Sequence, residues 1–184
     1  MFRGWTFCRL RNYVPTRSIA MLDGACLAAR LSFLSHEGGM SNEKRNMELM
    51  QTLDDAWNSQ DLETFEKRHR PDVVVTWPGK PPTNGLKAHN QEAIDFFKAF
   101  PNQHLDNRPY RVFFASGDWT CSIAHFTGTM TGPMTGPDGT EIKPTGKSFE
   151  VDFCTVARWD ENGQIIEENL FYDLVTFMKQ IGLG

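Results

Sequence analysis

The sequence predicts a domain of the α+β class, with helices first and a curved sheet of consecutive strands second. Apolar residues recur with helical spacing in three segments between residues 42 and 100, and one β-branched strand lies among them. From residue 110 to residue 172 the pattern changes to long stretches of β-branched and aromatic residues. Helices that are segregated from a run of hairpin strands are typical of this class.

The first helix is expected to begin after Ser41 or Asn42, because both residue types are preferred N-caps, and to end near residue 59. Asp61 caps a second, shorter helix, which Pro71 stops. A third helix follows Gly85 and ends near residue 100. The first helix carries an apolar stripe at helical spacing, made of Leu49, Met50, Leu53, Ala56 and Trp57.

A β-branched strand at residues 73–77 separates the second and third helices. Four longer strands are predicted at residues 110–115, 119–131, 149–159 and 164–172. The dipeptide Asn162-Gly163 predicts a tight turn with positive φ at both residues before the last strand. A short apolar helix at residues 174–181 then closes the domain. The long loop at 132–146, rich in Pro, Gly and Thr, is expected to be a lid or a mobile hairpin tip.

Charge and composition exclude several classes of function. The net charge of −4 argues against non-specific nucleic-acid binding, which requires clustered Lys and Arg. No apolar run approaches the ~20 residues of a membrane span. The four cysteines, Cys8, Cys26, Cys121 and Cys154, form no CxxC pair and are expected to be free, buried thiols. We therefore expect a cytoplasmic protein with no nucleic-acid or membrane partner.

Residues 1–39 differ from the rest of the chain. They hold five Arg, no Lys and only two acidic residues, a composition typical of an organellar targeting segment. Alternatively, translation begins at Met40, because the Glu-Gly-Gly codons that precede it are purine-rich like a bacterial ribosome-binding site. A third interpretation is that residues 1–39 are a genuine extension of the protein. In every case we expect a poorly ordered extension at 1–39 and a single domain at 40–184.

The last predicted strand carries the first candidate site. Alternation places Glu167, Asn169, Phe171 and Asp173 on one face and the residues between them on the other, so one of two adjacent glutamates must point inward. Asp173 then lies beside an aromatic ring, where a water-poor pocket could raise its pKa toward neutrality. The alternative interpretation is that Asp173 only caps the last helix.

Other polar residues are weaker candidates. His125 lies in the middle of a strand and could assist proton transfer, or it could be a hydrogen-bonded core histidine. Trp77 lines the pocket or packs in the core. His69, His89 and His104 are expected in solvent at helix ends or in loops, although His89 could reach the cavity.

Three stretches make the chain recognisable. They are residues 72–78 (DVVVTWP) with Gly85 and Ala88-His89, residues 117–120 (GDWT) running into 128–133 (GTMTGP), and residues 149–183 with Trp159, Phe171-Tyr172-Asp173 and Gln180-Ile181-Gly182. Over about residues 43–183 the chain resembles the nuclear-transport-factor-2-like superfamily. Within it, the chain resembles the SnoaL-like polyketide cyclase, or ester cyclase, family.

The resemblance implies a cone-shaped barrel, in which a curved mixed or antiparallel sheet wraps around about three N-terminal helices and a short C-terminal helix follows. It implies a homodimer formed through the outer face of the sheet, and no metal or cofactor. In characterised members, an aspartate near the end of the last strand is the acid/base of an intramolecular aldol closure. Asp173 matches that position.

We therefore expect a cofactor-independent cyclase or isomerase acting on a small, largely apolar carbonyl compound. Asp173 would abstract the α-proton while Asn169 and His125 hold the substrate oxygen. The residues expected to bind substrate are Trp77, Phe171, His89 and Phe153.

The alternative is a non-catalytic module of the same fold that binds small ligands. A less favoured alternative is a hydrolase of epoxides or a dehydratase. The hydrolase would need paired acids and an Arg on the cavity face, and Arg158 with Asp152 is the candidate pair, although Asp152 is expected to face solvent.

Overall fold

The computed structural model describes residues 41–136 and 139–184, so the predictions made for residues 1–39 and for Met40 lie outside the described residues. The elements in chain order are α2 (Asn42–Ser59), α3 (Leu62–Arg68), β1 (His69–Thr76), β2 (Thr83–Asn84), α4 (Leu86–Ala99), β3 (His104–Asp106), β4 (Val112–Ser116), β5 (Trp119–Thr129), β6 (Met134–Thr135), β7 (Glu141–Ile142), β8 (Ser148–Trp159), β9 (Ile165–Phe171) and α5 (Leu174–Gln180).

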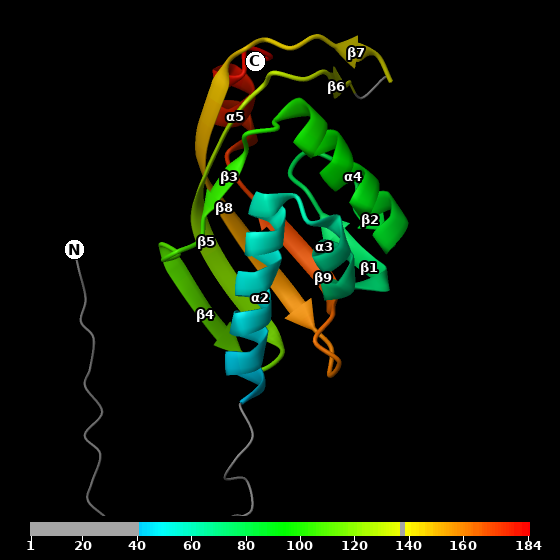
Figure 1. Ribbon diagram of the computed structural model, residues 1–184, viewed down its shortest axis with the longest axis vertical. Helices are drawn as coiled ribbons and strands as arrows, with labels where there is room; N and C mark the ends of the chain where they lie inside the picture. Colours follow the sequence, from blue (N-terminus) through cyan, green and yellow to red (C-terminus); the bar gives the residue numbers. More distant parts are fainter. Residues whose placement is uncertain (1–40, 137–138) are drawn as a thin grey trace, which may run out of the picture. The chain divides into compact units, whose positions relative to one another are not determined.

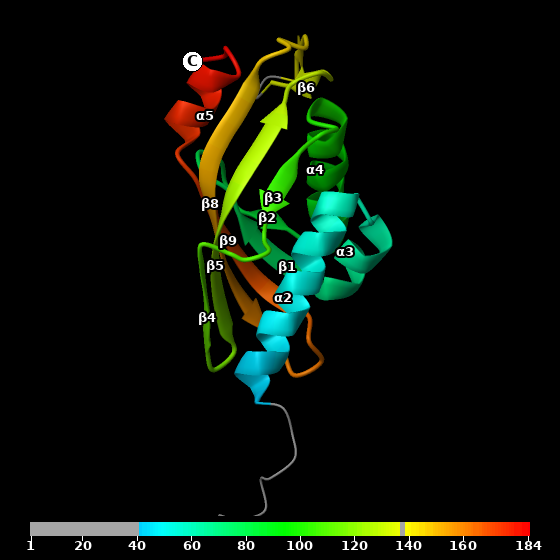
Figure 2. The same cartoon turned by 60° about the vertical axis from the view of Figure 1, so that its left-hand side comes forward.

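A curved mixed sheet forms one layer, and helices α2, α3 and α4 cover one of its faces (Figures 1 and 2). The strand order is β2-β1-β9-β8-β5-β3, and β4 pairs with β5 beside β3. Strand β9 runs parallel to β1 and antiparallel to β8, so it lies at the centre of the sheet. The predicted α+β class is confirmed. The sheet stays open between β2 and β3, so it is a curved sheet rather than a barrel.

Side-chain caps begin three of the helices as the sequence indicates. Ser41 accepts a hydrogen bond from the Lys44 backbone N–H at 3.3 Å, and Asp61 accepts one from Thr64 at 3.1 Å. The turn before β9 differs from its prediction, because Gly163 has positive φ (76°) and Asn162 does not. The Asp160 carboxylate instead accepts backbone N–H bonds inside this loop, which is longer than the expected two residues.

Aromatic side chains fill the space between the helices and the sheet. Along β5 and β8 every second residue is buried, as expected for strands with one face on the core. Phe100 on the α4 side and Phe149 on β8 meet edge to face with ring centroids 5.2 Å apart. The rings of this cluster belong to Phe96, Phe100, Phe126, Phe149, Phe153, Tyr172 and Phe177.

The Pro/Gly/Thr-rich loop forms a small hairpin from β6 and β7 beyond the end of β5. Its entry is fixed at Gly132, whose backbone N–H donates to the Ala99 carbonyl at 3.0 Å. A Cβ atom at position 132 would lie 1.8 Å from the Lys98 carbonyl oxygen. Glycine is therefore required where the hairpin crosses the end of α4.

Within residues 41–136 and 139–184, no helix is long and apolar enough to cross a membrane. Cys121 and Cys154 are free thiols, as expected, but they are half-buried rather than buried. Cys8 and Cys26 lie outside the described residues.

We expect Val75→Ala to destabilise the domain strongly. Val75 is fully buried on β1, in register with Glu168 on β9, so truncation leaves a cavity and should cost about 2 kcal/mol of unfolding free energy. The matched control Val175→Ala removes the same atoms from a side chain that is 62% exposed on α5, and it should be nearly neutral. Urea unfolding of both variants measures the difference. Equal losses would contradict the assignment of Val75 to the inner face.

Candidate active site

Strand β9 presents its second glutamate to the interior. Glu168 and Leu170 are buried on the inner face. Asn169 points the other way, and its side-chain amide donates to Glu167 Oε1 at 3.1 Å on the outer face. The predicted grouping of alternate residues is correct, but the face carrying Asn169 was wrongly chosen as the cavity face. Alternation tells which residues share a face and not which face is covered.

Asp173 lies at the surface and caps α5. Its Oδ1 accepts the Thr176 backbone N–H at 3.0 Å, and its Oδ2 accepts the Thr176 hydroxyl at 2.6 Å. These hydrogen bonds lower the pKa of Asp173 below its ordinary value, the opposite of the expected rise. The N-cap interpretation is confirmed, and the water-poor setting expected around Asp173 is wrong. Phe171, expected beside it in the pocket, is 54% exposed.

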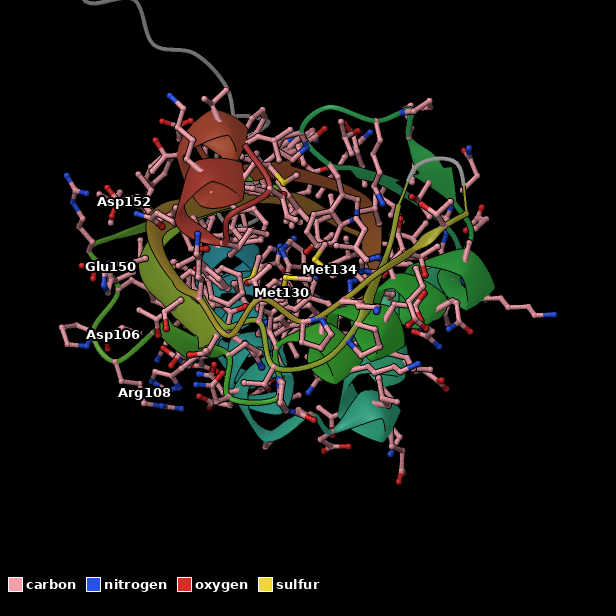
Figure 3. The ribbon with its side chains drawn as sticks, turned by 90° about the horizontal axis from the view of Figure 1, so that it is seen from above. Asp106, Arg108, Met130, Met134, Glu150 and Asp152 are labelled. Atoms are coloured by element: carbon pink, nitrogen blue, oxygen red, sulfur yellow. The ribbon has the colours of Figure 1, made fainter. Side chains whose placement is uncertain are left out.

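His125 also lies on the outer face of the sheet. Its side chain is 45% exposed, and Nε2 lies 3.2 Å from Glu150 Oε1. Figure 3 shows Glu150 and Asp152 on this outer side of the sheet. Asp152 pairs there with Arg111, as expected for a residue facing solvent.

The candidate pair for epoxide hydrolysis is absent from the cavity. Arg158 pairs with Asp118 at 2.8 Å on the outer face, and Asp152 lies on the same face. Neither side chain lines the apolar cavity under the helices.

That cavity lies between the helices and the inner face of the sheet. Trp77, His89 and Phe153, three of the four residues expected to bind substrate, line it. The other lining residues are Leu53, Asp54, Trp57, Phe65, Leu105, Thr155, Glu168 and Leu170. Its volume is about 30 Å³, room for one or two water molecules, so a substrate can enter only if lining side chains move.

Two histidines and a glutamate form a buried polar cluster at the cavity wall. His69 Nε2 lies 3.7 Å and His89 Nε2 lies 3.4 Å from Glu168 Oε2. His69 and His89 are 0% and 2% exposed, so the expectation that these histidines lie in solvent is wrong. A signal was present for His89, because it precedes the buried Ala93 and Phe97 at helical spacing. His69 opens a β-branched strand and carries no such signal.

A second layer of contacts orients both imidazoles. His69 Nδ1 lies 2.8 Å from the Phe65 carbonyl oxygen. His89 Nδ1 lies 3.2 Å from Glu92 Oε2, which also accepts the Trp77 indole N–H at 2.9 Å. Burial alone would raise the pKa of Glu92, but its contacts with His89, Lys80 and Thr83 lower that pKa to about 2.

The cluster is electrostatically self-consistent. Burial alone would lower the pKa of His89, but the carboxylates of Glu168 and Glu92 outweigh it and raise this pKa to about 9. Burial likewise would raise the pKa of Glu168, yet the two facing imidazoles lower it to about 2. Each charge is held in the interior by its opposite.

Asp54 is the second buried acid of the cavity. It is 6% exposed on α2, and its Oδ2 accepts the Tyr110 hydroxyl at 2.6 Å. Burial raises the pKa of Asp54 to about 7, against the lowering effect of Tyr110, and the Glu168 charge adds to the rise. Sequence reasoning missed this residue, although it follows the buried Met50 by four positions on the same helix.

The structure thus has an apolar cavity under helices and against a curved sheet, with buried ionisable groups in its wall. Cavities of this kind are where small-molecule sites are usually found. The family model of SnoaL-like polyketide cyclases matches residues 47–181. The chain therefore belongs to the SnoaL-like polyketide cyclase family. No curated protein sequence matches the chain.

Solved structures share the fold at low sequence identity. A candidate SnoaL-like polyketide cyclase from Jannaschia sp. CCS1 is 22% identical with a TM-score of 0.68, covering 80% of this chain and 99% of that one. IdmH from Streptomyces antibioticus, also named as a candidate polyketide cyclase, is 23% identical with a TM-score of 0.57, covering 74% and 98%. An LEH-like epoxide hydrolase from M. tuberculosis is 12% identical with a TM-score of 0.58, covering 76% and 90%.

We expect Asp54→Asn to stabilise the protein above neutral pH. The pKa of Asp54 is raised from 3.8 to about 7, so its favourable contribution is complete below pH 3.8 and is lost as pH rises through 7. Asparagine does not ionise, so the variant avoids this loss of unfolding free energy. The loss is roughly 4 kcal/mol once Asp54 is fully ionised in the folded protein.

Denaturant unfolding between pH 5 and pH 9, values bracketing the titration, measures the difference. The control is Asp55→Asn. Burial alone would raise the pKa of Asp55, but hydrogen bonds from Arg108 and Asn107, together with the Arg108 charge, outweigh it and lower this pKa. Its stabilising contribution is present above pH 3.8 and is lost as pH falls, so this variant should be less stable than the wild type at neutral pH. An Asp54→Asn effect that does not grow with pH would contradict the buried, protonated carboxyl.

Proposed function

We propose that the protein is an acid–base enzyme of the cyclase or isomerase type. It removes a proton from carbon beside the carbonyl group of a small, largely apolar compound bound in the cavity, and Asp54 is the base. The observation that carries this proposal is a buried carboxyl group among aromatic side chains of a cavity in a SnoaL-like domain.

The position of Asp54 suits proton abstraction from carbon. Tyr110 fixes Oδ2, and Oδ1 has no hydrogen-bond partner among the described residues, so it can face a substrate. A carboxylate in apolar surroundings is a stronger base than one in water, because its charged form is poorly solvated. The pKa of about 7 keeps a useful fraction of Asp54 ionised at neutral pH.

Enolisation also requires a group that stabilises the carbonyl oxygen, because negative charge develops on that oxygen when the proton leaves. His89 lines the same cavity and carries positive charge when paired with Glu168 and Glu92. A fixed positive group in a water-poor site stabilises an enolate oxygen far better than water does. Asp54 and His89 thus supply the base and the electrophile of one enolisation.

Access to this pair depends on the aromatic wall. Trp77 is held by Glu92, and Lys80 lies over the Trp77 ring at 5.3 Å from its centroid. Glu92 also accepts a hydrogen bond from Thr83 at 2.6 Å, so the segment that follows β1 is tied to α4. Movement of this segment would enlarge the cavity for a substrate while leaving Asp54 in place on α2.

The test is exchange of α-protons into D₂O, followed by proton NMR on a panel of 1,3-dicarbonyl compounds. The wild-type protein should accelerate exchange of at least one compound. Asp54→Asn should lower that rate by about 10²–10⁴-fold, the usual contribution of a general base. Asp173→Asn is the control and should leave the rate nearly unchanged, because Asn retains the cap and Asp173 lies outside the cavity.

Loss of exchange in the Asp173 variant alone would refute Asp54 as the base and restore the acid/base role expected from the family resemblance. Saturable binding of compounds without any enzyme-dependent exchange would refute catalysis and favour the ligand-binding module.

We also propose that two copies of the chain associate through the outer face of the sheet. Val112, Ile123, Cys154 and Phe171 are direct neighbours across β4, β5, β8 and β9 on that face. Val112 is 37% and Phe171 is 54% exposed, so the row leaves apolar surface in water.

Sedimentation velocity tests the association. The wild-type chain should sediment as a dimer, and Phe171→Lys should sediment as a monomer, because a charge at the β9 end of the row must be desolvated on association. Val175→Lys is the control, since Val175 is 62% exposed on α5 outside the row. A monomeric wild type, or equal effects of the two variants, would refute this interface.

A further inference from the structure

We propose that His69, His89 and Glu168 form a binding site for one divalent transition-metal ion, of the Zn²⁺ type. The three residues belong to β1, α4 and β9, and their ligand atoms all lie within 4.8 Å of one another. The proposal departs from the absence of a metal that the family resemblance implies, and it does not depend on the proposed reaction.

The distances fit a shared ion better than direct hydrogen bonds. Two ligand atoms that are each about 2.1 Å from a four-coordinate ion lie roughly 3.4 Å apart. The Nε2 atoms of His89 and His69 lie 3.4 and 3.7 Å from Glu168 Oε2. Hydrogen bonds between nitrogen and oxygen are shorter, with a mode of about 2.9 Å.

The tautomers are those of metal ligands. A backbone carbonyl only accepts hydrogen bonds, so His69 Nδ1, 2.8 Å from the Phe65 carbonyl, must carry the proton. The ionised Glu92 carboxylate imposes the same tautomer on His89 from 3.2 Å. Once a ring has lost its second proton, as binding of a metal ion requires, its lone pair is on Nε2, which faces Glu168. Metal-binding histidines are usually oriented in this way, by a carbonyl or carboxylate on the other nitrogen.

The two Nε2 atoms are also unsatisfied. Both are buried and have no hydrogen-bond partner among the described residues. A buried polar atom without a partner costs free energy, so such atoms are rare outside sites that hold something. Both Nε2 atoms face one carboxylate oxygen, Glu168 Oε2, which the two rings approach from different elements.

Packing holds the rings in this arrangement. The Phe65 ring lies 4.5 Å from the His69 ring and 5.0 Å from the His89 ring, measured between centroids, and the two imidazoles meet edge to face at 4.9 Å. An apolar shell of this kind fixes ligand orientation before the ion arrives. Imidazole nitrogen also selects Zn²⁺ and related ions over Mg²⁺ and Ca²⁺, which prefer oxygen.

Two nitrogens and one carboxylate oxygen leave coordination positions open. His89 and Glu168 line the cavity, so the open side of the ion would border the space assigned to substrate. A bound ion there would polarise a carbonyl oxygen, and it would replace the positive charge that His89 otherwise carries. Three protein ligands with a free position are typical of catalytic rather than structural zinc sites.

The test is direct binding to the purified full-length chain. Zn²⁺ is titrated by calorimetry in a buffer that does not chelate metals, and Co²⁺ is followed by its visible absorption. We expect one ion per chain and the intense Co²⁺ bands of a site with low coordination number. His69→Gln should weaken binding by at least the roughly 10–100-fold that is typical of losing a supporting contact.

His125→Gln is the matched control, because His125 pairs with Glu150 on the outer face and should leave binding unchanged. Glu168→Gln is a second ligand variant if His69→Gln does not fold. Asp54→Asn should retain the ion, which separates failure of the metal site from failure of the proposed base.

No saturable site in the wild-type protein would overturn the proposal and leave a simple His89–Glu168 ion pair. Binding that survives both ligand variants, or that is lost equally in His125→Gln, would overturn it as well.

Discussion

The carboxylate of Glu168, buried between two imidazoles, is the interaction on which the site depends. Strand β9 can hold this carboxylate inside only because β1 and β8 flank it and leave no edge open to water. Removing one partner would leave a buried charge without compensation, which is among the costliest defects in a protein interior. The positions of His69 at the start of β1 and His89 in α4 are therefore coupled through one side chain.

This polar cluster is tolerated because its surroundings are strongly apolar. Trp57 of α2 packs against both Phe65 of α3 and Phe97 of α4. The phenylalanine cluster continues along β8 to α5. Buried Asp54 adds a further electrostatic cost, because burial raises its pKa to about 7. Buried carboxyl groups with a raised pKa are typical of functional sites. Burial of the aromatic side chains offsets the free-energy cost of the buried charged groups.

Periodicity and caps in the sequence were sufficient to predict the helices, the long strands and the fold class. They could not predict which face of β9 is covered, because alternation is symmetric and helix packing decides between the faces. Asp173 was predicted to be catalytic because the wrong face was taken as the cavity face. Its carboxylate instead caps the N-terminus of α5. Asp54 and His89 lie on buried positions of their helices, so a charged residue at a core position was the informative signal. His69 and Glu168 are brought together only by the parallel pairing of β1 with β9, a contact between distant segments that local pattern does not contain.

The central claim is that the reactive carboxyl group lies inside the cavity on α2 and not at the end of β9. Carbon-13 NMR of the side-chain carboxyl groups across a pH series tests it most directly. We expect the Asp54 carboxyl to titrate with a pKa of about 7, and the Asp173 carboxyl to titrate below the ordinary value of 3.8. An ordinary pKa for Asp54 together with a raised pKa for Asp173 would contradict the claim.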